Sequence, residues 1–283
     1  MTKYHVDDTV ARQKARLVVK GLTQVYGADY DETYVSVCSY VTLTVFLSIV
    51  AALDLHLMQL DLKNALLKSK LDRVLYMDQP SYNNNDTNCV CKLPKSLYSL
   101  KQSPLLRCST LDAVLNGASW SKSLINEAPY FKVGDDGVSC WVLDYINDLL
   151  AARSSLAMMK ELSELLHNAF EQHKISPVEK YLGLEIVRGR PAWKLWLHQQ
   201  SYVNKLLRHF IDEELSGQRL KTPVFVNAYA DMMFGEEDFN ARDEDEYRQK
   251  FGSLQVAATT TRPDIAFACN ELGSDLTTQG NQH

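Results

Sequence analysis

The chain has 283 residues, of which 46% are hydrophobic and 23% charged, so it can bury a large core and is not a disordered chain. Its formal net charge of −5 at first argues against a nucleic-acid partner, because phosphate binding depends on Lys and Arg. The longest apolar run, Val41 to Leu60, is interrupted by polar and charged residues, which excludes a helix that spans a membrane.

The distribution of the charge along the chain weakens this argument against a nucleic-acid partner. Asp212 to Arg248 contains eleven acids and four bases, a local balance of −7, whereas Met1 to Gln24 contains five bases and two acids. The acidic stretch is typical of a solvated linker. The basic beginning is suited to contact with phosphates, although surface charge without a partner is the simpler explanation for most of it. A nucleic-acid partner is therefore not excluded.

Six cysteines are present, without a paired C-x-x-C pattern and without a signal peptide before them. We therefore expect a reduced, intracellular chain, cytoplasmic or nuclear, with no targeting signal. Cys89 and Cys91 are separated by one residue, which is more typical of two strand residues than of half a zinc site.

The first part of the chain predicts a helix between two strands. Residues 14–19 alternate between basic and apolar, which predicts a strand with its two basic residues on one face. Residues 41–55 carry apolar side chains at helical spacing and predict a buried helix. The apolar run over residues 57–62 predicts a strand that ends near Asp61.

Residues 142–150 form an apolar run that is broken by Asn147 and Asp148 and then becomes apolar again. This pattern predicts a β-hairpin with Asn147 and Asp148 as its two-residue turn, although an ordinary surface hairpin would show it as well. Asp61 and Asp148 thus both stand at predicted strand ends, far apart in sequence. Two such carboxylates suit Mg²⁺, which takes oxygen ligands, and paired ions of this kind catalyse phosphoryl transfer in polymerases.

The rest of the chain predicts a loop, helices and a second hairpin. Residues 81–88 are rich in Asn and predict a loop, and residues 156–172 carry the clearest apolar stripe of a helix. Residues 181–198 predict the second hairpin. Residues 201–210 predict an amphipathic helix, whose basic outer side either lies along a nucleic-acid duplex or is simply solvated.

Seven segments, in chain order, resemble the reverse transcriptase of copia-type retrotransposon Pol polyproteins. They are KARLVVKG (14–21), YDET (30–33), QLDLKNA (59–65), LYMDQP (75–80), KSLYSLKQSP (95–104), YLGLEI (181–186) and TRPDIAFA (261–268). Together they extend over nearly the whole chain. The resemblance implies an α+β fold of the right-hand polymerase type, with fingers, a palm built on an antiparallel sheet, and a thumb.

The resemblance also implies partners and site residues. The reaction would be RNA-directed DNA synthesis, in which the 3′-hydroxyl of a primer attacks the α-phosphate of a dNTP on an RNA or DNA template. Asp61 and Asp148 would be the catalytic carboxylates and would hold two Mg²⁺ ions. Tyr181, Leu182 and Gly183 would bind the primer. The nucleotide-binding residues would be Lys14, Arg16, Asn64, Ala65, Leu66 and Gln102.

Three departures from the family pattern lie in this predicted site. The family's central hairpin reads Tyr-Val-Asp-Asp, whereas Asn147 stands here in place of the first aspartate and brings no charge. Leu66 replaces an aromatic residue that excludes a ribose 2′-hydroxyl, and residues 104–107 replace the usual Pro-Arg-Ala-Trp. Because a lost carboxylate weakens both metal binding and transition-state stabilisation, we expect a polymerase fold with impaired catalysis.

We expect residues 1–225 to form the reverse transcriptase domain, with the thumb from about residue 176. Residues 226–283 would form an acidic linker and the start of the connection to an RNase H domain. The chain would be a fragment of a polyprotein, without the integrase and RNase H segments. A catalytically dead remnant, or a co-opted module that binds nucleic acid, is the alternative. An unrelated hydrolase or metal protein is disfavoured, because the sequence contains no Gly-rich phosphate loop, no H-E-x-x-H and no G-x-S-x-G.

Overall fold

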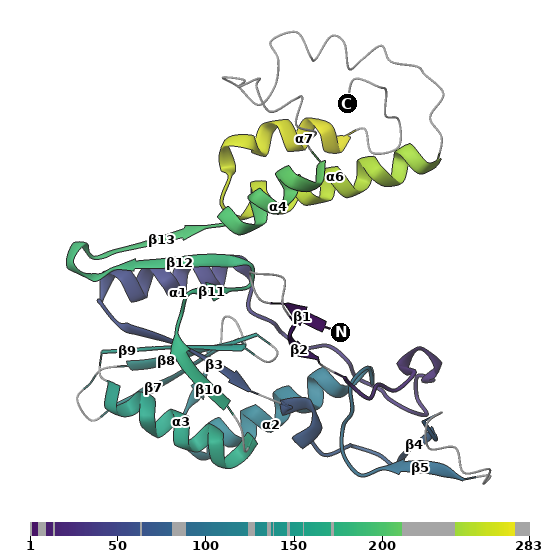
Figure 1. The fold of residues 1–283 in the computed structure, drawn as a ribbon. Helices are drawn as coiled ribbons and strands as arrows, with labels where there is room; N and C mark the ends of the chain where they lie inside the picture. The colour runs from purple at the N-terminus through teal and green to yellow at the C-terminus, as the bar shows by residue number, and fades with distance from the viewer. Residues whose placement is uncertain are drawn as a thin grey trace. The chain divides into compact units, whose positions relative to one another are not determined.

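The computed structural model divides the chain into two compact units, Met1–Val178 and Glu179–His283 (Figure 1). The residues that it describes are 2–4, 10–13, 15–62, 64–80, 89–123, 128–134, 137, 139–145, 148–154, 156–170, 173–210 and 241–274. Helices and strands occur in both units, so the chain is a mixed α and β protein.

An antiparallel sheet forms the centre of the first unit (Figure 1). Segments far apart in sequence lie side by side in it, because strands from the middle of the chain flank the strand near residue 60. Among the described residues its strand order is β10 (His173–Pro177), β3 (His56–Leu62), β9 (Asp148–Arg153), β8 (Ser139–Tyr145), β7 (Pro129–Val133) and β6 (Ser121–Lys122).

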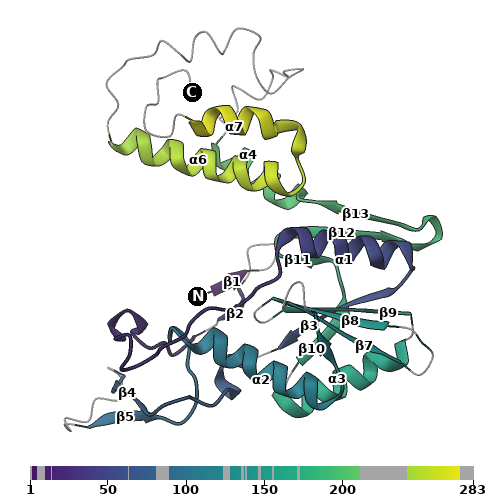
Figure 2. The same ribbon diagram turned by 180° about the vertical axis from the view of Figure 1, so that it is seen from behind.

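Helices cover both faces of this sheet. Helix α1 (Tyr40–Ala52) lies on one face, and α2 (Ser103–Gly117) and α3 (Leu156–Phe170) lie on the other (Figures 1 and 2). The side chain of Ser39 caps α1 by accepting a hydrogen bond from the Thr42 amide at 3.1 Å, which satisfies a donor that the first helical turn leaves free. The sheet is thus a middle layer between helices.

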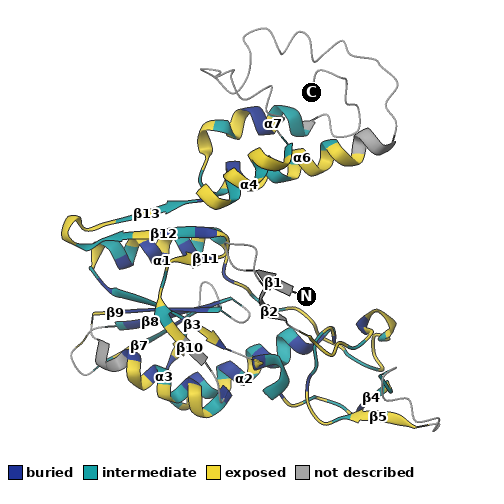
Figure 3. Cartoon of the chain, in the orientation of Figure 1, coloured by how far each residue is buried: buried dark blue, intermediate teal, exposed yellow. Residues whose placement is uncertain are grey.

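The main hydrophobic core lies between the sheet and the pair α2 and α3 (Figure 3). Alternate residues of the strands point into it, as the two-residue period of a strand requires. The buried residues of β3, β9 and β8 in this cluster are Leu60, Leu62, Leu149, Ala151, Cys140 and Val142. Asp61, between Leu60 and Leu62, and Asp148, directly before Leu149, therefore lie on the opposite face of the sheet.

Smaller elements surround the sheet of the first unit. Strands β4 (Leu75–Asp78) and β5 (Val90–Leu93) pair as a hairpin-like ladder, and β1 (Thr2–Tyr4) pairs with β2 (Val10–Gln13). The remaining elements are the short 3-10 helices η1 (Gly21–Thr23) and η2 (Ala65–Lys68).

The second unit combines a small sheet with helices. The Trp196 ring lies close to Gly189 of the neighbouring strand, where a Cβ would come within 2.6 Å of the indole ring, so a larger residue does not fit there without a shift. Its strands and helices are β11 (Lys180–Tyr181), β12 (Leu184–Gly189), β13 (Lys194–His198), α4 (Gln200–Phe210), α6 (Ala241–Thr260), α7 (Ala266–Ser274) and the short η4 (Arg190–Ala192) and η6 (Pro263–Ile265).

Hydrogen bonds join the helices of the second unit to one another. The Tyr202 hydroxyl on α4 donates to the Ser253 carbonyl on α6 at 3.0 Å, and the Tyr247 hydroxyl on α6 donates to the Leu272 carbonyl on α7 at 2.7 Å. These bonds connect residues far apart in sequence and fix the pairing of α4 with α6 and of α6 with α7.

The structure confirms the central hairpin but corrects its turn. Tyr145 of β8 pairs with Asp148 of β9, so Asp148 is the first residue of a strand and not a turn residue. Residues 146 and 147, and with them Asn147, lie outside the described residues. The predicted helices near 41–55, 156–172 and 201–210 are all present, with slightly different ends.

The strand predicted over residues 14–19 is wrong for the part that the structure describes. Within residues 15–20, Val18 forms an isolated bridge with Tyr98 and no named strand is present. A two-residue pattern permits a strand, but a ladder needs a partner along its whole length. Lys14, the loop predicted at 81–88 and the domain boundary predicted near 225 lie outside the described residues.

Among the described residues, no helix has both the length and the apolar character that crossing a membrane requires.

Candidate functional site

Two carboxylates lie side by side on the sheet face opposite the main core. Asp61 of β3 and Asp148 of β9 are direct partners in the antiparallel ladder. Directly opposite residues of such a pair project from the same face, with Cβ atoms about 5 Å apart. Asp61 is exposed and Asp148 is half-buried. The two acids that the sequence placed at separate strand ends are therefore brought together by the pairing of β3 with β9.

The surroundings of Asp148 disfavour its negative charge in the absence of a cation. Burial raises the pKa of Asp148, and the nearby charge of Asp61 raises it further, whereas a hydrogen bond from Gln59 and the charge of Arg107 lower it. The Gln59 Nε2 donates to Asp148 Oδ1 at 3.3 Å. This bond holds one carboxylate oxygen in place.

The donor set of this pair fits a hard divalent cation. Both ligating groups would be carboxylate oxygens, which Mg²⁺ prefers. No group of three or more His, Cys, Asp or Glu side chains that could hold a metal is found in the part of the chain that the structure describes. The described site thus offers two carboxylates, side by side and open to solvent on the side of Asp61.

A buried ion pair lies behind the carboxylates, on the core side of the sheet. Arg107 of α2 places its Nη1 atom 2.6 Å from Oδ1 and 2.5 Å from Oδ2 of Asp144, a residue of β8. Both side chains are almost fully buried. Burial raises the pKa of Asp144, and the Arg107 charge and hydrogen bonds oppose this.

Neither Arg107 nor Asp144 was among the predicted site residues, although the sequence around each of them is unusual. Asp144 interrupts an apolar strand, and Arg107 ends the segment that replaces Pro-Arg-Ala-Trp. Two opposite charges at positions otherwise suited to apolar side chains indicate a buried pair, since an isolated buried charge is strongly unfavourable.

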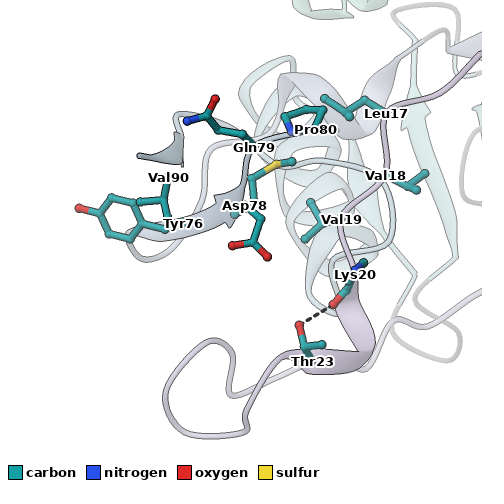
Figure 4. Close-up of a pocket in the computed structure, with 11 residues that line it drawn as sticks. Leu17, Val18, Val19, Lys20, Thr23, Tyr76, Asp78, Gln79, Pro80 and Val90 are labelled. Atoms are coloured by element: carbon teal, nitrogen blue, oxygen red, sulfur yellow. Dashed lines mark hydrogen bonds between the residues drawn. The ribbon is translucent and has the colours of Figure 1, made fainter. Parts of the chain in front are cut away.

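A second feature of the first unit is an open pocket of about 720 Å³ (Figure 4). Its walls come from two segments, one around η1 and one from β4 and β5. Lys20 and Asp78 are its charged lining residues, and the Thr23 hydroxyl donates to the Lys20 carbonyl at 2.8 Å. The other lining residues are Leu17, Val18, Val19, Tyr76, Met77, Gln79, Pro80 and Val90.

The residues predicted to bind a nucleotide differ in accessibility. Arg16 is exposed, and its guanidinium carbon lies 5.3 Å from the centre of the Tyr98 ring. Gln102 is 1% exposed, and its amide bonds with other parts of the chain, so this structure does not present it to a ligand. Of the other predicted residues, Asn64 is exposed with a left-handed φ of 56°, Ala65 is buried, and Leu66 is half-buried.

The residues predicted to bind a primer lie at the end of β11 and in the turn that follows it in the second unit. Tyr181 is 2% exposed and belongs to the interior of that unit. Leu182 and Gly183 are exposed and have positive φ angles of 49° and 82°. Gly183 tolerates such a φ without strain, which suits a tight turn.

Comparison with known proteins gives consistent matches. A family model described as reverse transcriptase (RNA-dependent DNA polymerase) matches residues 1–224. The chain is 32% identical over 290 residues to the retrovirus-related Pol polyprotein from transposon TNT 1-94 of Nicotiana tabacum, and 98% of this chain and 21% of that protein are covered. It is 29% identical over 283 residues to the corresponding polyprotein from transposon RE1 of Arabidopsis thaliana, covering 99% of this chain and 19% of that protein. The chain therefore spans about a fifth of the length of these two relatives.

Proposed function

This chain belongs to the reverse transcriptase family, as the corresponding part of a copia-type Pol polyprotein, and from that membership we propose that it is an RNA-directed DNA polymerase domain with a weakened active site. The observation that supports the proposal best is the direct pairing of Asp61 with Asp148. The substrates would be a dNTP and a primer on an RNA or DNA template, and the chain would act inside the cell.

In this proposal the elements take the parts of a right-hand polymerase. The sheet that carries the two carboxylates is the palm. Residues 15–31 and the ladder of β4 and β5 belong to the fingers, and the thumb begins near residue 176. Residues beyond about 225 form the linker towards an RNase H domain.

Asp61 and Asp148 would hold the Mg²⁺ ions. When bound, two such ions neutralise charge on the attacking and leaving oxygens of a phosphoryl transfer. Only the ionised carboxylate ligates a metal, so the raised pKa of Asp148 should make metal binding weaken as the pH falls, and Gln59 orients one of the Asp148 oxygens. Arg16 would meet the triphosphate of the nucleotide, and the turn of Tyr181, Leu182 and Gly183 would contact the primer.

Two substitutions limit the activity that we propose. Asn147 contributes an amide oxygen without charge, so two carboxylates instead of three would face the ions. Leu66, which is half-buried at the start of η2, is a smaller wall than an aromatic ring against the sugar. The same asparagine favours the alternative function, which is a catalytically dead remnant or a module that binds primer and template without extending the primer.

Primer extension on an RNA template tests the proposal. The chain as it stands should give little or no product with Mg²⁺ or Mn²⁺, and Asn147→Asp should increase the product at least tenfold by restoring a charged ligand. Asn116→Asp adds the same charge at an exposed position at the end of α2 and should change nothing.

The outcomes separate the two functions. If Asn147→Asp extends the primer and the additional change Asp148→Asn abolishes extension, the polymerase proposal stands. If neither the chain nor Asn147→Asp extends but both bind primer–template with an affinity that falls with salt, the chain is a binding module. Strong extension by the unaltered chain would contradict the weakened site.

A further inference from the structure

Residues 16–30, which we call the strap, lie along residues 97–102, the segment that leads into α2. Val18 forms a parallel bridge with Tyr98, and the Val19 amide donates to the Tyr98 carbonyl at 3.0 Å. Gly21 approaches so closely that a Cβ there would lie 1.8 Å from the Ser99 carbonyl oxygen. The contact at Gly21 therefore admits no side chain without a backbone shift.

Lys101 extends this contact along the strap. Its backbone amide donates to Gln24 Oε1 at 2.8 Å, and its Nζ donates to the Gln24 carbonyl at 3.1 Å and to the Tyr30 hydroxyl at 3.2 Å. The same ammonium lies 4.7 Å from the centre of the Tyr30 ring, which adds a cation–π attraction. One side chain thus binds the strap at two separate points.

Gln102 uses both ends of its amide on the strap. Its Oε1 accepts from Gln24 Nε2 at 3.0 Å, and its Nε2 donates to the Asp29 carbonyl at 2.9 Å. The side chain is 1% exposed. Removal of this amide would leave partly buried polar groups of Gln24 and Asp29 without these partners, which costs more than the loss of a fully solvated bond.

The strap also supplies one wall of the pocket in Figure 4, including Leu17, Val18, Val19, Lys20 and Thr23. Arg16 is its first residue and stacks on Tyr98. The place of the strap therefore determines where Arg16 and Lys20 present their charges. Arg73 anchors the strap independently, because its Nη1 donates to the Ala28 carbonyl at 3.0 Å.

We infer that Gln102 is a positioning residue that holds the strap on residues 97–102 and thereby places Arg16 and Lys20 for a triphosphate, instead of contacting the nucleotide itself. The triphosphate as ligand rests on the proposed function. The role of Gln102 in holding the strap does not depend on that function. Gln24 is the strap side chain that bonds with Gln102, and the Asp29 carbonyl is the second strap group that Gln102 holds.

Hydrogen exchange of the full chain tests the docking without any activity. Gln102→Met keeps the size of the side chain and removes its polar atoms, and Gln24→Ala removes the partner. Each should accelerate exchange of the Val19 and Gln24 amides by about tenfold, and the double variant should be no faster than either single one. Strand β3 should exchange as before, because Arg73 and the sheet are untouched.

Gln255→Ala, an exposed change on α6, is the matched control and should leave exchange of the strap unchanged. Titration with dGTP in the presence of primer–template then separates the two roles of Gln102. A positioning role predicts that Gln102→Met and Gln24→Ala weaken dGTP binding by similar factors.

Two results would overturn the inference. One is unaltered strap exchange in Gln102→Met. The other is weaker dGTP binding in Gln102→Met with normal binding in Gln24→Ala, which is the pattern of a direct contact. If the unaltered chain binds no dGTP, the proposed function fails, while the exchange experiment still decides the role of Gln102 in the strap.

Discussion

Removing one partner of the Arg107–Asp144 pair should destabilise the first unit far more than removing both. Both side chains are almost fully buried, and one nitrogen, Nη1, makes both contacts with the carboxylate. Arg107→Met leaves the carboxylate of Asp144 without its cation, and Asp144→Leu leaves the guanidinium without its anion. A buried charge stripped of its partner costs about 3–5 kcal/mol.

The buried pair does not satisfy every hydrogen-bond donor of Arg107, and this determines the stability expected of the double variant. The Nε and Nη2 atoms of Arg107 are buried without a hydrogen-bond partner in the described structure. A buried donor without a partner costs about 1–3 kcal/mol. Arg107→Met combined with Asp144→Leu removes both charges and both unpaired donors, so it should be neutral or stabilising by about 1–4 kcal/mol.

Urea unfolding followed by circular dichroism measures these differences in unfolding free energy as shifts in the urea concentration at the midpoint, with an unchanged slope of free energy against urea concentration. Thermal melts of the same variants give the corresponding shifts in Tm. For a unit of this size, each single variant should lower Tm by roughly 6–20 °C, whereas the double variant should equal or exceed the unaltered chain. The loss in Arg107→Met should shrink as the pH falls, because Asp144 can then take up a proton. Additive losses in the double variant would refute the reasoning, and so would single losses below about 1 kcal/mol.

Two further predictions concern carboxylates. Asp148→Asn should raise Tm by about 2 °C at pH 7 in the presence of a chelator, because it removes a half-buried charge that Asp61 repels. Because the pKa of Asp148 is raised, this gain should disappear at low pH, where Asp148 is protonated, and a gain that persists there would contradict the stated cause. Contacts with Ser201 and Lys180 lower the pKa of Glu185 to about 2, so Glu185 should stabilise the second unit above pH 4.5 and lose this effect as the pH falls towards 2. Thermal melts of Glu185→Gln should therefore match those of the unaltered chain only near pH 2.

Local pattern was sufficient for most elements of the fold. The apolar periodicity predicted α1, α3 and α4, and the interrupted apolar run predicted the hairpin of β8 and β9. The strand predicted at 14–19 failed where residues 15–20 are described, because alternation alone supplies no partner strand. That segment instead contacts Tyr98 through a single bridge at Val18, the Val19 amide and the Arg16 side chain.

The candidate site was predicted in part. Asp61 and Asp148 were named from their places at strand ends, and the family resemblance assigned their role. Gln102 was assigned to nucleotide or template contact on the same resemblance, and that role stays a prediction, but its side chain is buried against Gln24 and the Asp29 carbonyl. No pattern in the sequence predicts that residues 24 and 102 are in contact.

The sequence by itself determined the family, the presence of an asparagine at position 147 and the elements that carry the two carboxylates. Only the tertiary structure decided that Asp61 and Asp148 are direct partners, and that Arg107 and Asp144 are buried together behind them. The physical reason is that local periodicity reports which face of an element is apolar. The register between strands, and the partner of each buried polar group, depend on how distant segments pack.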